Sequence, residues 1–193
     1  MSSTTEPRVT ASTDARHFVP SWVLYEKAPA EPWLFRGIAL QTLYKLWQDE
    51  RNAAAVEVPL YASLAARSLD DVKPFLGIWT IGAGDDPSIE TVFLGEGPLA
   101  YLKSRDVSAD APLKDQTPAP NFADVRFRMM DVRDKRHANY CVKSMAYLAS
   151  PFGRYEALYL PFGDEAGDRV THVVVAFSFV FGFDNTNWVF GGV

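Results

Sequence analysis

The sequence predicts an α+β fold, built as a five-stranded antiparallel sheet with helices on one face and an N-terminal helical flank. Two observations support this prediction. Stretches with strand character occur as an adjacent pair in the middle of the chain and as three in succession towards its end. A helical segment separates the two groups. The helical crossover must therefore connect the second strand to the third across the sheet.

The composition is that of a folded protein. Of the 193 residues, 48% are hydrophobic and 22% are charged, which is ordinary for a globular domain. A net charge of −5 argues against a nucleic-acid partner, and the longest apolar run is too short to span a membrane. The single cysteine, Cys141, excludes an internal disulfide framework and a cysteine-based zinc cluster.

The N-terminal part of the chain divides into a tail and a flank. Residues 1–17 are polar and lack the apolar core of a secretory signal, so we expect a disordered tail and a cytoplasmic protein. Residues 18–74 form the flank. Within it, aromatic residues alternate with prolines over residues 18–34, which favours an extended arm because proline prevents a long helix.

The flank also contains helical patterns. Residues 35–50 place apolar side chains on two sides of a helix, which indicates either a helix between two partners or one buried helix in a monomer. Ser68–Asp71 can begin a short helix, which must end before Pro74. The apolar surface of this flank is the main reason to expect a homodimer.

Residues 75–181 form the predicted domain, followed by a C-terminal tail at 182–193. The strands are expected at residues 75–81, 89–94, 140–150, 155–162 and 170–181. A short helix is expected over residues 98–105. Asn121 can cap a longer helix that continues to His137. These helices lie between the second and third strands.

This order of elements resembles that of a PAS domain, with two strands, three helices and three strands over residues 75–181. In detail the chain resembles a family of single-domain PAS-like proteins of alphaproteobacteria. The segments that carry the resemblance are Leu43–Glu50, Ser68–Gly77, 92–115 and 155–178. Leu158–Phe162 (LYLPF), before a polar turn and a valine-rich last strand, has the greatest weight. The sequence FLGEG at 93–97 departs from the strand-Gly-Thr pattern that is usual in the family.

The resemblance implies a regulatory rather than an enzymatic protein. PAS-like domains respond to a small molecule, to light or to redox state through a cavity between sheet and helices. They transmit the signal through the sheet face or a flanking helix, often as dimers. The partners implied are a small-molecule ligand and a downstream signalling protein, while the sequence identifies no cofactor.

In such a fold the inner face of the sheet and the apolar stripe of the long helix would line the cavity. The ligand-binding candidates are the large side chains Trp79, Phe93, Tyr101, Phe122, Met129, Tyr140, Tyr147 and Tyr159. Tyrosine hydroxyl groups and a tryptophan indole inside an apolar shell can orient a ligand. The alternative interpretation is that these side chains simply fill the core.

The other motifs favour structural interpretations. His137 follows the long helix, where some haem-binding PAS domains carry their axial histidine, but it lies in a charged stretch at the edge of the apolar stripe. Cys141 lacks the Asn-Cys-Arg-Phe-Leu context of flavin-binding light sensors, so we interpret it as a buried structural cysteine. Residues 123–136 have five basic and three acidic side chains, which we interpret as a solvated helix face.

Two other classes of function remain open. A small α+β-barrel enzyme of the ketosteroid-isomerase-like type would also wrap a sheet around an apolar pocket. It would need an inward-facing acid with a shifted pKa, for which Glu156 and Asp168 are the candidates next to strands. The second alternative is a structural interaction module with a filled core.

Overall fold

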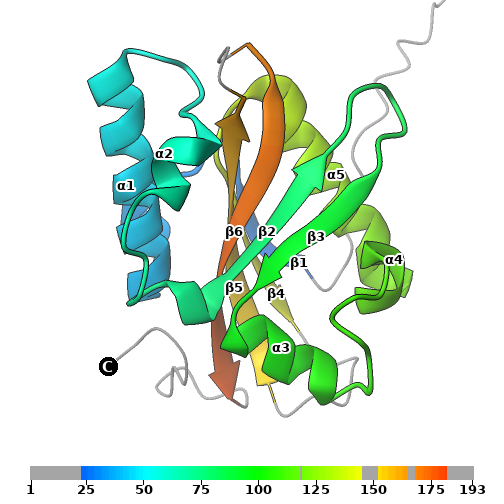
Figure 1. Ribbon diagram of the computed structural model, residues 1–193. Coiled ribbons are helices and arrows are strands. Elements are labelled where there is room, and N and C mark those ends of the chain that lie inside the picture. The colour runs from blue at the N-terminus through cyan, green and yellow to red at the C-terminus, as the bar shows by residue number, and fades with distance from the viewer. Residues whose placement is uncertain (1–22, 118, 145–151, 165–167, 182–193) are drawn as a thin grey trace, which may run out of the picture.

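The computed structural model describes residues 23–117, 119–144, 152–164 and 168–181. Its centre is one six-stranded antiparallel sheet, with the order β1-β4-β5-β6-β2-β3 (Figure 1). The strands are β1 (Val23–Lys27), β2 (Leu76–Ile81), β3 (Ile89–Leu94), β4 (Asn139–Ser144), β5 (Phe152–Gly163) and β6 (Val170–Phe181). The helices are α1 (Ile38–Ala54), α2 (Tyr61–Ala65), α3 (Glu96–Lys103), α4 (Leu113–Gln116) and α5 (Ala119–Lys135). Single 3-10 turns lie at Pro32–Leu34 and Lys73–Phe75.

The sheet has one strand more than the sequence predicts, because the N-terminal arm joins it. Residues Val23–Lys27 of the arm are extended as expected, but they pair with β4 and form an edge of the sheet. The expectation of five strands is therefore wrong. The pairing covers the outer edge of β4, whose backbone groups would otherwise lack strand partners.

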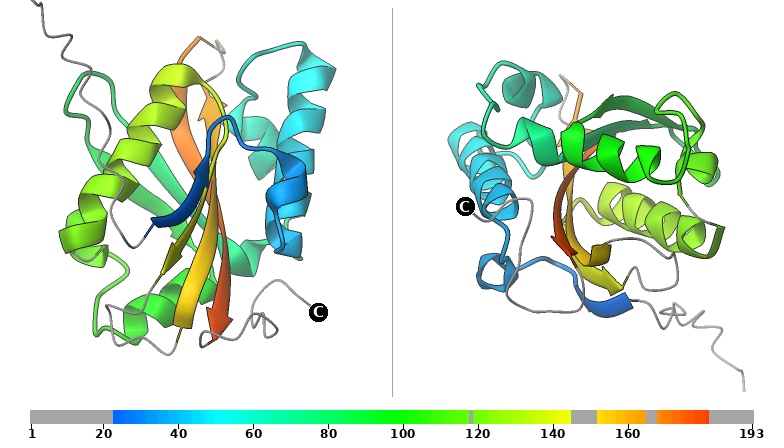
Figure 2. Two further views of the ribbon diagram at one scale, coloured as in Figure 1. Left: turned by 180° about the vertical axis from the view of Figure 1, so that it is seen from behind. Right: turned by 90° about the horizontal axis from the view of Figure 1, so that it is seen from below.

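Helices cover both faces of the sheet rather than one. Figure 2 shows α1 on one side of the strands and α5 on the other. Helix α1 contacts β5 and β6 from one face, and α5 contacts β4, β5 and β6 from the opposite face. The expectation of helices on one face is wrong because the flank folds back onto the free face of the same sheet.

Helix α1 buries its main apolar side within the chain. Leu40, Leu43 and Trp47 are almost fully buried, and the Trp47 indole Nε1 donates a hydrogen bond to the Pro161 carbonyl oxygen at 2.9 Å. Ile38, on another side of the helix, remains 50% exposed. This packing agrees with the interpretation of one buried helix in one chain. The homodimer stays a prediction.

The crossover between the two groups of strands runs as predicted. Strand β3 is one edge of the sheet, while β4 lies four places away in the strand order, beside the other edge strand. Helices α3, α4 and α5 make this connection. From β2 to β6 the order of elements is therefore two strands, three helices and three strands.

In the segment between α1 and β2, the local predictions differ from the structure in two places. A helix beginning at Ser68 is not formed; the Ser68 hydroxyl instead donates to the Asp70 carboxylate at 2.8 Å, and only a 3-10 turn follows at Lys73–Phe75. Pro74 lies within that turn, where its ring prevents an α-helix from continuing. Helix α2, in the alanine-rich stretch before it, was not expected.

The sheet separates two apolar clusters. Along β5, Leu158 and Leu160 face α1, whereas Ala157 and Tyr159 face α5, as alternation along a strand requires. Because both faces are covered, the central strands β5 and β6 are mainly apolar, with a few polar residues such as Glu156 and Ser178. In the part of the chain that the structure describes, no helix has the length and apolar character needed to cross a membrane.

Candidate functional site: an aromatic cavity and a buried polar network

A cavity of about 80 Å³ lies between the α5 face of the sheet and the helices α3, α4 and α5. The sheet contributes mainly aromatic side chains, which are Trp79, Tyr155, Tyr159, Phe177 and Phe179. The helices and the segment between them contribute Tyr101 and Met129, with the polar residues Gln116, Thr117 and Asn121 among further apolar ones. The cavity is therefore an apolar space with a few polar groups on its wall, which is how small-molecule sites are usually built.

The structure brings half of the predicted ligand-binding residues together at this cavity. Trp79, Tyr101, Met129 and Tyr159 line it. Phe122 packs half-buried against the same apolar cluster without lining the cavity. These five residues come from strands and helices that are distant in the sequence. The apolar stripe of the long helix and the alternation of side chains along the strands were enough to predict that they lie on the same side of the sheet.

The other three candidates lie elsewhere. Tyr140 faces α1, because alternation along β4 directs it to the opposite face from Cys141. Phe93 packs half-buried against the cluster on the α1 side, with the Lys73 ammonium 5.6 Å from the centre of its ring. Tyr147 lies outside the described residues.

Within the part of the chain that the structure describes, Trp79, which lines the cavity, has a buried side-chain nitrogen atom without a hydrogen-bond partner. Its side chain is 4% exposed, and its indole Nε1 has no hydrogen-bond partner among the described residues. The indole lies across Gly77, where a Cβ atom would come within 2.1 Å of the Trp79 ring. Leaving a buried donor unpaired costs about 1–3 kcal/mol, so a bound acceptor or a water molecule in the cavity would relieve that cost.

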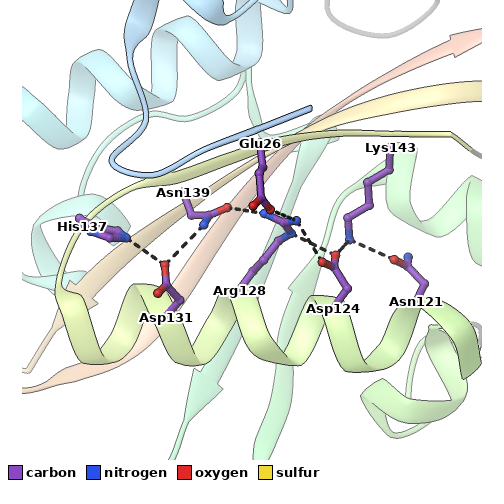
Figure 3. Close-up of polar contacts among 8 residues, drawn as sticks. All are labelled: Glu26, Asn121, Asp124, Arg128, Asp131, His137, Asn139 and Lys143. Carbon is purple, nitrogen blue, oxygen red and sulfur yellow. Dashed lines mark hydrogen bonds and ion pairs between the residues drawn. The ribbon is translucent and has the colours of Figure 1, made fainter. Parts of the chain in front are cut away.

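A buried polar network runs along the side of α5 that faces the sheet (Figure 3). Four α5 residues contribute to it, namely Asn121, Asp124, Arg128 and Asp131. Their spacing of three, four and three residues places them on one helix face. The other members are Glu26 from β1, Asn139 and Lys143 from β4, and His137 from the turn before β4. We call these eight residues the α5 network.

The centre of the α5 network is one carboxylate shared by two buried cations. Both Arg128 and Lys143 are fully buried. The Arg128 guanidinium donates through Nε and Nη2 to the two carboxylate oxygens of Asp124, each at 3.0 Å. The Lys143 Nζ lies 2.5 Å from Asp124 Oδ2, the oxygen that also accepts from Arg128 Nε. Burial alone would raise the pKa of Asp124, but Lys143 and Arg128 outweigh it and hold that pKa below its ordinary value.

The remaining donors of Arg128 connect the centre to two strands. Its Nη2 donates to Glu26 Oε2 on β1 at 2.9 Å, and its Nη1 donates to Asn139 Oδ1 at 3.0 Å. Asp131, further along α5, lies 2.9 Å from His137 Nε2. Burial would raise the pKa of Asp131, but Lys135 and His137 outweigh this effect and lower it.

Asn121 belongs both to the α5 network and to the cavity wall. Its Oδ1 accepts a hydrogen bond from Lys143 Nζ at 3.0 Å, and its Nδ2 donates to the Tyr155 hydroxyl oxygen at 3.3 Å. Asn121 and Tyr155 both line the cavity. The buried charges are therefore one side chain away from the space that a ligand would occupy.

Sequence reasoning missed this network. Asn121 was expected to cap the helix, but α5 begins at Ala119 and the Asn121 side chain points to β4 and β5 instead. The charged residues of α5 were expected on a solvated face, yet Asp124 and Arg128 are buried. One signal was present, because Lys143 interrupts an otherwise apolar strand and needs an acidic partner nearby.

The two acids considered for an enzyme do not lie at the cavity. Glu156 is 1% exposed and faces α1, where it accepts hydrogen bonds from the Tyr140 hydroxyl at 2.8 Å and from the Gly37 backbone N–H at 3.1 Å. Burial raises the pKa of Glu156, and these donors act against that effect. Gly37 is needed here because a Cβ atom would lie 2.7 Å from Ser178 Cβ. Asp168 is exposed before β6, and its backbone carbonyl accepts from Arg136.

The arrangement suits binding by hydrogen bonds and apolar contact. Cys141 is fully buried, as predicted, and burial raises the pKa of its thiol. Over the described ranges, no group of three or more histidine, cysteine, aspartate or glutamate residues is placed to hold a metal ion.

Comparisons of the chain with protein-family models, with curated proteins and with solved structures find no match.

Proposed function

We propose that this protein is a non-enzymatic, cytoplasmic PAS-like regulatory domain that binds a small, mainly apolar ligand in the aromatic cavity. The observation that carries the proposal is that Trp79, one of the residues lining the cavity, has a buried indole N–H without a hydrogen-bond partner among the described residues. The PAS-like assignment is supported by the order of elements from β2 to β6 and by the position of the cavity between sheet and helices. The signal would pass to a partner protein by contact.

The size and lining of the cavity define the chemical class of the ligand. A volume of about 80 Å³ is well below the roughly 150 Å³ of an engineered cavity that holds benzene. A ligand of only a few carbon atoms fits, and it should carry one hydrogen-bond acceptor, such as a carbonyl oxygen, for Trp79 Nε1. The ring systems of haem and flavin are too large for this space. His137 binds Asp131 and lies outside the cavity wall.

Butanone and its alkene analogue, in which a methylene group replaces the oxygen, test the proposal. The two molecules have the same chain and branching, the alkene being slightly larger, but only butanone can accept a hydrogen bond. We expect saturable binding of butanone by calorimetric titration, about fivefold tighter than that of the alkene, because one hydrogen bond contributes about 1 kcal/mol.

Two variants make this test specific. Trp79→Phe keeps an aromatic wall but removes the donor, so it should abolish the preference for butanone. Trp33→Phe is the matched control, because Trp33 is 75% exposed and is not among the cavity-lining residues. An absence of saturable binding by either compound would contradict the proposal and favour a structural module with a filled core.

A further inference from the structure

We propose that occupancy of the cavity is coupled to the docking of strand β1 through the side chains of Asn121, Lys143, Asp124, Arg128 and Glu26. This inference names the regulation of the proposed ligand site and rests on that proposed function. Figure 3 shows these side chains in an unbroken line from the start of α5 to β1. Each contact along the line joins groups that are charged or strongly polar.

The line begins at the cavity wall. Asn121 holds Lys143 with its amide oxygen at 3.0 Å and the Tyr155 hydroxyl with its amide nitrogen at 3.3 Å. A molecule that packs against Asn121 and Tyr155 must contact the Asn121 amide and so change its orientation or its hydrogen bonds. Any rotation of the amide changes the oxygen available to Lys143, whose ammonium is fully buried and has no access to water in exchange.

The middle of the line transmits such a change because two cations share one oxygen. Lys143 Nζ and Arg128 Nε both bind Asp124 Oδ2, at 2.5 and 3.0 Å. When Lys143 loses or gains the Asn121 oxygen as a partner, its contact with the Asp124 carboxylate changes in strength. The contact of Arg128 with the same carboxylate oxygen then changes as well. Hydrogen bonds of buried charged groups are strong and polarise one another, so these adjustments are coupled.

The line ends at β1, a short strand at the edge of the sheet. Arg128 Nη2 donates to Glu26 on β1 at 2.9 Å, and the Glu26 side chain is 38% exposed while Arg128 is fully buried. Two buried cations face one buried carboxylate, so Glu26 supplies the second negative charge only while β1 is docked. Within the described ranges, β1 pairs only with β4, and three of its five residues are exposed.

A double-mutant cycle in the full chain tests the coupling without any ligand. The variants are Asn121→Ala, Glu26→Gln and the two combined, and the measurement is amide hydrogen exchange of Val23–Lys27. Amides of β5 report on global stability in the same experiment. We expect the effects of the two substitutions on β1 exchange to deviate from additivity by at least about threefold.

Two further cycles guard against trivial outcomes. Tyr155→Phe removes only the hydroxyl that binds Asn121, and it replaces Asn121→Ala if that variant does not fold. Asp49→Asn removes an exposed partner of Lys45 on α1 and should combine additively with Glu26→Gln. Additive effects on β1 exchange in every network cycle whose variants fold would overturn the proposed coupling.

Hydrogen exchange measured with added butanone tests this inference separately from the function on which it rests. Saturating butanone should change β1 exchange in the natural chain and have no such effect in Glu26→Gln. Failure of butanone to bind would count against the proposed function, while the mutant cycle still decides the coupling. Binding of butanone without a change in β1 exchange would show that the cavity is occupied but not coupled to β1.

Discussion

Asp124 supplies the negative charge that compensates the two buried cations of the α5 network. It lies between two fully buried cations and contacts both. A buried charge that loses its partner is strongly destabilising, whereas an exposed ion pair contributes little. The α5 network therefore depends more on Asp124 than on its partially exposed member Glu26.

Asp124→Asn should accordingly lower the free energy of unfolding by about 3–5 kcal/mol. The physical reason is that Arg128 and Lys143 keep their charges and lose the carboxylate between them. Urea denaturation measures the change. Asp49→Asn, which breaks an exposed pair with Lys45, should cost less than about 1 kcal/mol. Equal effects of the two substitutions would contradict the assignment of Asp124 as the centre of the network.

The buried acid Glu156 should make the stability of the fold depend on pH. Burial raises its pKa above the ordinary value of 4.5, so the folded chain holds this proton more tightly than the unfolded chain does. The unfolded state loses the proton first as the pH rises. The contribution of Glu156 to stability therefore falls from about pH 4.5 up to the folded pKa, with full stability below that window.

Glu156→Gln should remove this dependence. Relative to the variant, the natural chain should become less stable as the pH is raised through that window. Urea midpoints measured across the acid range check this, with Glu90→Gln, at an exposed position of β3, as the control. A constant difference between Glu156→Gln and the natural chain at every pH would contradict the raised pKa.

Single residues show how far the sequence alone reached. Trp79, Tyr101, Met129 and Tyr159 were predicted at one cavity because large side chains on an apolar stripe face the core. The role of Asn121 was not predicted. Helical periodicity places a residue on a face, but it does not reveal which strand supplies the partner across from that face.

At the scale of elements, the strands were predicted better than the flank. The bounds of β3 and β6 agree with the sequence prediction, because turn residues border both strands. Strand β1 was expected only as an extended arm. Its place at the sheet edge depends on pairing with β4, which lies more than a hundred residues later in the chain.

Helix α1 is held by its sheet-facing side, which gives a prediction at this scale. Leu43→Ala should lower the free energy of unfolding by about 2–5 kcal/mol, because Leu43 is fully buried against the sheet. Ile38→Ala is the matched control in the same helix, where the side chain is 50% exposed. Thermal or urea unfolding compares them. Similar losses from both would show that α1 has a second buried side, against another chain.

At the scale of the whole molecule, the fold class was predictable and the layering was not. Composition and the grouping of strands indicated an antiparallel α+β domain, which the structure shows. The flank was set apart from that domain because its prolines and aromatic residues interrupt any regular pattern. It instead supplies β1 to the sheet and α1 to the second face.

The predicted homodimer belongs to this scale as well. The flank packs α1 onto its own sheet, but Leu24 and Trp33, which precede α1, remain more than half exposed. We expect light scattering to give twice the mass of the 21.5 kDa chain. Trp33→Ala, which removes the most exposed of these side chains, should shift the protein towards the monomer. A strictly monomeric natural chain at high concentration would contradict the prediction.

The central claim is that the cavity beside Trp79 receives a small ligand with a hydrogen-bond acceptor. The most direct test is an NMR titration that follows the Trp79 indole N–H resonance while butanone is added. We predict a saturable downfield shift of that resonance, no comparable shift for the exposed Trp33 indole, and no downfield shift with the alkene analogue. A Trp79 resonance that stays unmoved at saturating butanone would contradict the account.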